Sequence, residues 1–549
     1  MLAYCITVYE QHKKLILGCL LFILVFSLLG LPFIHWNFET DDWGNIYLSN
    51  IKHWADIKKF FINIETSTYA SNYTASQQSF FCGLLRPMTF VFYYVQHLFF
   101  GLNPYGYFLV TVGVHALSTA VLFYLYSLFT NLYAAFFAAV FFGFHPSIGR
   151  WLGWISPQSY QIELLLFLFI ILLLHRYLTT AQPSWYVLAC LLFLSNLFLR
   201  EQTVVFPFWL IVACYLYRKS QQPNADRFNN ILYSIKFSLP FWCISLFYLG
   251  VRLMLFPFNA AHTGTLTFEL TWYSFIKRQS ERFFDFVTYA SDFCGLSHLP
   301  TNHQILKGSL IVSLCLLLGW LFYYNSKKVY VLFAACSTLF FSWPALLMHY
   351  QPRYMYIAIP FSLLTVLLLV EFYQGYRVSS TTKKIAALLF SCLIATNAFM
   401  DMQGFYRREQ RSYIPARAFH ELVQNPITRG RAICFLCLPN QYLTVGCAQA
   451  VWLLSGDNTR PVFHISPYMK IKGKDYTELR TTYITFTPIK HGLCCSSTNP
   501  DKICFITREG DAYTTQNIVL TDQILSSNPL FVTWDYKNQH FAIMPERPL

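Results

Sequence analysis

The sequence LILGCLLFILVFSLLGLPFIHWNFETDDW, at residues 15–43, joins a long apolar run to the first acidic pair of the chain. The run at 15–33 is long enough to cross the hydrocarbon core of a bilayer, which takes about 20 apolar residues. Two lysines precede it and no small-residue cleavage site follows it. We therefore expect a retained membrane anchor with a cytoplasmic N-terminus. Asp41 and Asp42 come soon after the anchor, and adjacent carboxylates should lie in water or beside a bound cation or substrate.

The overall composition is that of a polytopic membrane protein. Of the 549 residues, 55% are hydrophobic and 12% are charged, and the mean hydropathy is +0.40. A soluble domain is far less apolar. The net charge of +14 would suggest nucleic acid in a soluble chain, but many of the basic residues fall in short loops between apolar runs. We therefore expect membrane lipid, and no nucleic acid, among the partners.

The apolar runs predict about eleven membrane-spanning helices. They lie near residues 15–34, 105–129, 132–147, 158–178, 184–199, 203–217, 231–256, 305–324, 329–348, 353–372 and 384–400. With the N-terminus inside, the basic loops that follow alternate spans are all cytoplasmic, as the positive-inside rule requires. The long loops at 35–104 and 257–304, and the chain after residue 400, are then extracytoplasmic.

Two domains are expected, a helical transmembrane domain at 1–400 and a small soluble α/β domain at 401–549. The tail should begin with a helix at 413–424 and continue with short strands. The strands are predicted near 432–438, 461–465, 503–507 and 531–534. Its six cysteines lack the spacing and partner histidines of a zinc ribbon, which favours disulfides or buried free thiols.

The first external loop, at 35–104, contains a predicted amphipathic helix. Apolar side chains recur at helical spacing from Trp43 to Phe61, with charged residues on the other faces. Such a helix can lie on the outer membrane surface, and ordinary packing within the loop is the alternative. A similar pattern occurs at 272–290, in the second long loop.

Five polar clusters fall on the external side of the predicted topology. They are Asp41-Asp42, Arg86-Pro87, His145-Pro146 with Arg150, Arg200-Glu201, and His349 with Arg353-Tyr354. A transporter is expected to keep ionisable groups near the bilayer midplane, along a path open to both sides. Clustering at one face instead favours an enzyme that works at the outer interface.

These stretches resemble the GT-C superfamily of polytopic membrane glycosyltransferases, and within it the protein O-mannosyltransferase family and its TPR-tailed transmembrane relatives. The stretches occur in family order from residue 15 to about 372. They are Asp41-Asp42-x-x-x-Ile46-x-x-x-Asn50, Arg86-Pro87 with Gly101-Leu102-Asn103-Pro104 and His115-Ala116-Leu117, Phe144-His145-Pro146 with Trp154-Ile155-Ser156, Arg200-Glu201-Gln202-Thr203, and Arg353-Tyr354-x-Tyr356.

The chain also departs from the family pattern. Ile148 and Arg150 stand where the pattern has a second His and a Glu, and Pro157-Gln158-Ser159-Tyr160 replaces a Gly-Arg-x-Asp element. A second acidic group is therefore missing from that loop, so a carboxylate-bound divalent metal is weakly supported and no cofactor is firmly implied. The tail shows no TPR period.

The resemblance implies transfer of a sugar from polyprenyl or dolichyl phosphate to an extracytoplasmic acceptor, with inversion. The resemblance leaves three acceptors open: a protein Ser/Thr, lipid A or lipopolysaccharide, and another envelope glycan. Asp41 is the implied base that removes the proton of the acceptor hydroxyl, with Asp42 orienting. Capping of the following helix is the alternative role of the pair, above all for Asp42.

Cations should bind the phosphate of the leaving carrier, and arginine suits that task because of its bidentate fork. Arg353 beside Tyr354 is the first choice, followed by Arg86, Arg150 and Arg200, and interfacial snorkelling is the alternative for each arginine. For the remaining polar groups there are also alternative roles. His145 and His349 donate to sugar or phosphate or cap helix ends. Glu201 pairs with Arg200 or a cation in the cavity, or it forms a structural ion pair. His115 is expected to be a hydrogen-bonded core residue.

Two other functions stay open, a lipid-linked sugar transporter or flippase and a non-catalytic glycolipid-binding relative. Arg150, in place of the family's acid, keeps the second one open. A bacterial inner membrane is preferred to the endoplasmic reticulum because no retention signal is visible at the C-terminus.

Overall fold

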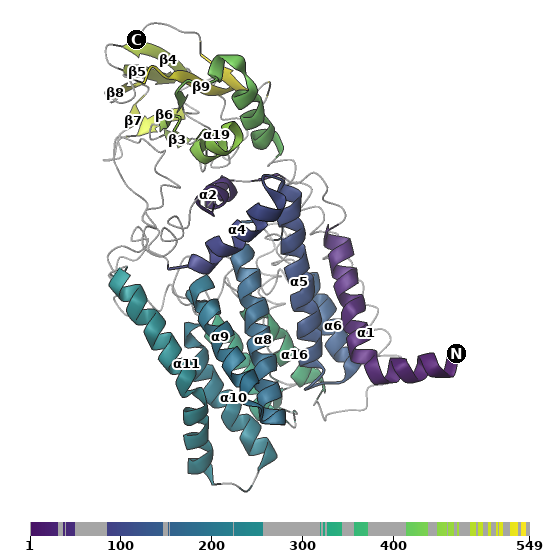
Figure 1. Cartoon of the computed structure of the whole chain (residues 1–549). Coiled ribbons are helices and arrows are strands. Elements are labelled where there is room, and N and C mark those ends of the chain that lie inside the picture. Colours follow the sequence, from purple (N-terminus) through teal and green to yellow (C-terminus); the bar gives the residue numbers. More distant parts are fainter. Residues whose placement is uncertain are drawn as a thin grey trace. The chain divides into compact units, whose positions relative to one another are not determined.

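The computed structural model forms two compact units, which we describe separately (Figure 1). Unit 1 comprises residues 1–34, 83–92 and 105–407, and unit 2 comprises 35–82, 93–104 and 408–549. The described residues are 2–30, 37–38, 40–49, 85–145, 152, 154–222, 224, 226–255, 319, 322–323, 325, 327–342, 356–371, 413–436, 447–457, 459–465, 469–471, 484–489, 492–497, 503–506, 512–513, 515–519, 527–535, 538 and 540–544.

Unit 1 is built from helices. They are α1 (Leu2–Gly30), α5 (Pro104–Tyr126), α6 (Leu132–Gly143), α8 (Gln158–Thr180), α9 (Pro183–Leu199), the 3-10 helix η2 (Glu201–Val205), α10 (Phe206–Gln221), α11 (Arg227–Leu255), α14 (Lys328–Phe341) and α16 (Ala358–Glu371). α4 (Pro87–Phe100) begins in unit 1. α8 packs on α9, α10 on α11, and α14 on α16.

Four of the described helices are long and apolar enough to cross a membrane, namely α1 over His12–Gly30, α5, α8 and α11. Four more apolar helices, α6, α9, α14 and α16, have 10–17 residues. The chain is thus mostly helical and compatible with a membrane protein. The spans predicted at 305–324 and 384–400 lie largely or wholly outside the described residues.

The connection from α8 to α9 shows how local sequence ends one helix and starts the next. Ala181 adopts a left-handed conformation with φ of 56°, and its backbone N–H donates to the Tyr177 carbonyl at 2.8 Å. That closing turn terminates a helix. Pro183 then occupies the first position of α9, where its fixed φ suits a helix start and its missing N–H costs nothing.

An aromatic cluster joins α8, α10, α14 and α16. Phe167 of α8 is 1% exposed. Its ring centroid lies between 5.0 and 6.2 Å from those of Phe206, Trp209, Phe341 and Phe361. Burial of such large rings is a strong apolar contribution to packing, so this cluster holds η2, which lies between α9 and α10 in sequence, against the bundle.

Unit 2 contains a four-stranded sheet of order β10-β9-β1-β2. β1 (Ile433–Leu436) is parallel to β2 (Val462–Ile465) and to β9 (Leu530–Asp535), and β10 (His540–Ile543) is antiparallel to β9. All four residues of β1 are buried, as expected of a central strand. α19 (Cys447–Ser455) lies between β1 and β2 in sequence, which makes a βαβ crossover.

The tail also contains two three-stranded sheets. One has the order β3 (Met469–Ile471), β6 (Ile503–Ile506) and β7 (Ala512–Tyr513), and the other β4 (Ile484–Ile489), β5 (Gly492–Ser497) and β8 (Thr515–Val519). A helix covers residues 413–424 and a 3-10 turn, η7, follows at Pro426–Thr428. The predicted helix and the four predicted strands are confirmed to within about two residues. Cys434 and Cys447 are buried free thiols.

Candidate functional site

An ion pair lies at the start of η2. The Arg86 guanidinium donates through Nη2 to Glu201 Oε1 at 2.6 Å and through Nε to Oε2 at 2.9 Å. The two side chains are 20% and 24% exposed. Such a two-pronged contact is a strong, directional form of salt bridge. The structure thus shows Glu201 in a structural ion pair, one of the roles expected for it, with Arg86 rather than Arg200 as the partner.

The same pair decides the charge state of Glu201. Burial by itself would raise the pKa of this carboxyl, but the charge and hydrogen bonds of Arg86, together with the charge of Arg200, lower it from 4.5 to about 2. Glu201 is therefore ionised at neutral pH. Since Glu201 balances the charge of Arg86, Arg86 can bind a phosphate only by sharing or breaking this pair.

Arg200 is held by α8. Its Nη1 donates to Ser159 Oγ at 2.7 Å, and its guanidinium carbon lies 3.2 Å from the centroid of the Tyr160 ring. The residue is 7% exposed. A cation stacked on an aromatic face in a dry environment is well stabilised. Ser159 and Tyr160 thus orient the guanidinium from two sides. An interfacial snorkelling arginine keeps its guanidinium in water and would lack these contacts.

Glu163 is the residue at this site that the sequence analysis missed. It lies one turn beyond Ser159 and Tyr160 on the same face of α8, and it is fully buried. The charges of Arg200, Glu201 and Arg86 act on it, as does the backbone N–H of Thr203. Neither of its carboxylate oxygens has a hydrogen-bond partner. A buried carboxyl without partners is costly, so this position calls for a functional explanation.

Two guanidinium groups and two carboxyl groups thus gather where α8 begins and η2 starts. The only sequence signal for Glu163 is a single acid inside an otherwise apolar run, at QIELLLFLFI. An ionisable group in such a run is a candidate functional residue by default. In the part of the chain that the structure describes, no group of three or more His, Cys, Asp or Glu side chains is suited to hold a metal ion.

The two histidines of the central motifs are core residues. His115 Nε2 lies 3.0 Å from the Gly143 carbonyl oxygen and Nδ1 lies 2.5 Å from the Tyr356 hydroxyl. The carbonyl can only accept, so Nε2 donates and the unprotonated Nδ1 accepts from Tyr356. The expectation of a hydrogen-bonded core histidine is confirmed. His145 is 5% exposed and its ring lies 5.8 Å from that of Phe141.

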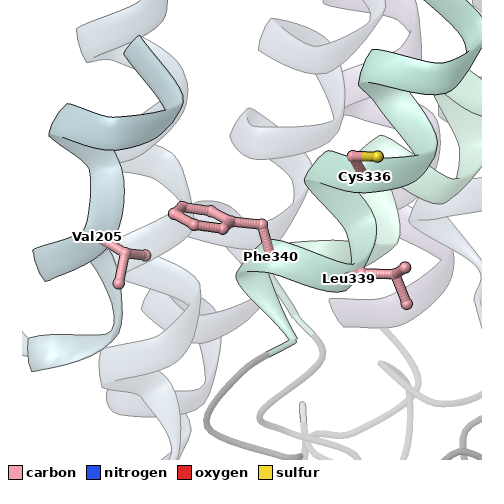
Figure 2. Close-up of a pocket in the computed structure, with 4 residues that line it drawn as sticks. All are labelled: Val205, Cys336, Leu339 and Phe340. Atoms are coloured by element: carbon pink, nitrogen blue, oxygen red, sulfur yellow. The ribbon is translucent and has the colours of Figure 1, made fainter. Parts of the chain in front are cut away.

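An apolar pocket of about 410 Å³ lies at the other end of η2 (Figure 2). Val205, the last residue of η2, lines it together with three residues of α14, Cys336, Leu339 and Phe340. Gln202 Nε2 donates to the Phe341 carbonyl at 3.1 Å, which fixes η2 against α14. A pocket with this lining suits a hydrocarbon chain rather than a polar group.

The acidic pair lies in unit 2, on the first turn of α2 (Thr40–Ser49). Helix α2 already begins at Thr40, so Asp42 lies within its first turn rather than at the capping position before it. Asp42 is fully buried, and Asp41 belongs to the same turn. Trp43 and Ile46 are also buried in the protein. In the described part of this helix, these two apolar side chains therefore pack against protein rather than rest on lipid.

Four of the predicted site residues, Arg150, His349, Arg353 and Tyr354, lie outside the described residues. Within unit 1 the structure brings together Arg86, Arg200 and Glu201. It places His145 in the core. A comparison with protein-family models and with curated protein sequences finds no match.

Proposed function

We propose that the chain is an integral-membrane glycosyltransferase. It moves a sugar, with inversion, from a polyprenyl- or dolichyl-phosphate carrier to an extracytoplasmic acceptor. The acceptor is a protein Ser/Thr, lipid A or lipopolysaccharide, or another envelope glycan. The glycosyl part of this proposal rests on the GT-C resemblance, and the carrier part is supported by the chemistry of unit 1.

The observation that carries the proposal is that η2 bears charged groups at one end and an apolar pocket at the other. Glu201, at its start, is paired with Arg86 and follows Arg200, whereas Val205, at its end, lines the pocket. A 3-10 helix rises about 2 Å per residue, so these ends are about 8 Å apart. A ligand with an anionic head and a hydrocarbon chain needs cationic groups for the head and an apolar pocket for the chain.

Each group then has a stated role. Arg200 stabilises the negative charge that develops on the departing phosphate, because it is the guanidinium of the described cluster that makes no ion pair closer than 4.0 Å. Asp41 removes the proton of the acceptor hydroxyl while the phosphate leaves from the opposite face of the sugar. Asp42 orients this carboxylate, and no step requires a metal ion.

The proposed topology has about eleven spans, a cytoplasmic N-terminus and the tail outside, in a bacterial inner membrane or, alternatively, the endoplasmic reticulum. The basic residues between apolar runs support this orientation. The active site would then be on the extracytoplasmic side, where the carrier-linked sugar is presented.

The proposal is tested by transfer of radiolabelled sugar from a panel of polyprenyl-phosphate donors to a membrane extract by the purified protein. Asp41→Asn should lower transfer by about 10²- to 10⁴-fold, the usual contribution of a general base, with donor binding intact. Asp226→Asn is the matched control, because Asp226 accepts from the Asn229 N–H at 3.2 Å at the start of α11 and asparagine caps helices equally well. Equal transfer by unmodified protein and Asp41→Asn would remove Asp41 from the chemistry.

A second candidate function, transport of a lipid-linked sugar, is favoured by one observation, the buried Glu163 carboxyl inside α8. A transporter would depend on such an intramembrane acid more than on Asp41. Flipping of a fluorescent lipid-linked sugar in proteoliposomes, abolished by Glu163→Gln and unaffected by Asp41→Asn, would support transport. The opposite pattern, in a transfer assay, supports the glycosyltransferase.

A further inference from the structure

We infer that the C-terminal domain positions the acidic helix α2 through a contact between Tyr47 and Trp452. This inference rests on the proposed function in one respect, the role of the Asp41-Asp42 pair as the base. It goes further by giving the tail a part in catalysis and by naming the residues that perform it.

The contact joins two segments some 400 residues apart that belong to the same compact unit. α2 packs on α19, and the two helices lie next to each other in Figure 1. The ring centroids of Tyr47 and Trp452 are 5.1 Å apart and the rings are tilted by 40°. This separation is typical of attractive aromatic pairs.

Trp452 is fixed by the tail itself. Its indole Nε1 donates to the Arg460 carbonyl oxygen at 2.7 Å. Arg460 is 4% exposed, and its guanidinium donates to the backbone carbonyls of Arg431 and Thr428. The indole is therefore tied to the turn before β1 by a short series of hydrogen bonds, and it offers α2 a ring whose orientation is already set.

α19 is in turn fixed on the sheet. Cys447, Ala448, Ala450 and Val451 are fully buried on one side of the helix, and α19 contacts β2. Gly456, with φ of +70°, ends the helix in a conformation that favours glycine. α2 thus packs against an element that cannot turn or slide without disturbing its contact with β2, the edge strand of the sheet.

Because α2 is short, the contact at Tyr47 also affects the position of the acidic pair. Tyr47 lies five and six residues beyond Asp42 and Asp41, about 8 Å along the helix axis. A second ring contact, Phe38 against Trp43 at 5.1 Å, holds the start of the helix. The Tyr47–Trp452 contact limits rotation and tilt of the helix against the tail.

Loss of the Tyr47 contact should therefore misdirect the carboxylates. Side-chain tips lie about 5–6 Å from a helix axis, so a rotation of about 20° moves them about 2 Å. A displacement of about 1 Å from productive geometry can cost on the order of 10²-fold in rate. Binding of the carrier lipid, which involves groups of unit 1, should change little.

The test compares Trp452→Ala, Trp452→Phe and Trp534→Ala in the full-length purified protein. Trp534 is the matched control, because it is a buried tryptophan in β9 of the sheet that α19 contacts, and its ring lies 5.2 Å from that of Phe541. Two quantities are measured, the kcat and KM for a polyprenyl-phosphate-linked sugar and the rate of amide hydrogen exchange in residues 40–49.

Trp452→Ala should lower kcat by about 10- to 100-fold with KM for the lipid donor within about twofold, and should speed exchange in 40–49 by about tenfold. Trp452→Phe keeps a ring against Tyr47 and should retain most of both properties. Trp534→Ala should leave exchange in 40–49 unchanged. Unchanged exchange in Trp452→Ala, or equal effects of Trp452→Ala and Trp534→Ala, would overturn the inference.

The two proposals can fail separately. If the unmodified protein transfers no sugar, or if Asp41→Asn transfers normally, the proposed function fails while the exchange experiment still decides whether Trp452 holds α2. If Asp41→Asn abolishes transfer and Trp452→Ala changes neither kcat nor exchange, the proposed base stands and the positioning role of the tail is wrong.

Discussion

Replacing Glu201 by Gln should lower the free energy of unfolding of unit 1 by about 2–3 kcal/mol at pH 7. The fall in the pKa of this carboxyl from 4.5 to about 2 corresponds to about 3 kcal/mol, since one pKa unit is worth about 1.4 kcal/mol. The partners are 20% and 24% exposed, so screening by solvent reduces this somewhat. The variant also removes from the partly buried Arg86 guanidinium the carboxylate that it contacts, which adds to the loss.

The pH dependence gives the sign of the effect. Because the folded-state pKa of Glu201 lies below its unfolded value, the stabilisation is fully present above about pH 4.5 and is lost as the pH falls towards about 2. Glu201→Gln has no carboxyl to titrate. The stability curves of the unmodified protein and of this variant should therefore converge between about pH 4.5 and pH 2.

The assay is reversible unfolding in mixed detergent micelles of the unmodified protein, Glu201→Gln, Arg86→Met and the double variant. The double-mutant cycle should give a coupling of about 2 kcal/mol. The control is the exposed Arg417–Glu421 pair, whose side chains are 63% and 47% exposed and whose removal should leave unfolding unchanged. A coupling below about 0.5 kcal/mol, or parallel pH curves for Glu201→Gln and the unmodified protein, would refute the reasoning.

Two further substitutions test the packing around α6. Gly143→Ala should destabilise the protein by about 1–3 kcal/mol, because a Cβ there would lie 2.8 Å from Val25 Cγ2 and 3.3 Å from Thr119 Cγ2. The thermal midpoint should fall and should be partly restored by adding Val25→Ala. An unchanged midpoint would contradict the steric overlap. Tyr356→Phe should lower the free energy of unfolding by about 1–3 kcal/mol, because it removes the hydroxyl that lies 2.5 Å from the buried His115 Nδ1. Chemical unfolding measures this loss. A variant as stable as the unmodified protein would argue against the hydrogen bond.

Local signals were sufficient for the secondary structure. Apolar runs long enough to span a bilayer mark α1, α5, α8 and α11, and their length follows from bilayer thickness alone. Pro183 marks the start of α9 because proline suits the first turn of a helix. In the tail, short β-branched and aromatic runs between turn residues mark β1, β2, β6 and β9. Helix α9 matches the predicted run at 184–199 to within one residue, whereas α6 ends at Gly143, before the predicted end at residue 147.

The candidate site was only partly predictable. Arg86, Arg200 and Glu201 were singled out as polar residues next to apolar runs, but Arg86 was not identified as the ion-pair partner of Glu201. Arg200 and Glu201 are adjacent in sequence and project in different directions from the start of η2, so Arg86, 115 positions away from Glu201, is the partner. Glu163 was missed because one acid in an apolar run differs little from a helix-face residue until its neighbours are known.

The sequence by itself determined that the chain is rich in membrane-length apolar helices, where four of its strands lie, and which polar residues stand at helix ends. These properties depend on hydrophobic periodicity and backbone preference over short windows of chain. Only the tertiary structure decided which charges meet, that Glu163 is buried without a hydrogen bond, and that Trp452 of the tail packs on Tyr47 of α2. Contacts between residues hundreds of positions apart arise from packing of whole elements, and no local pattern specifies them.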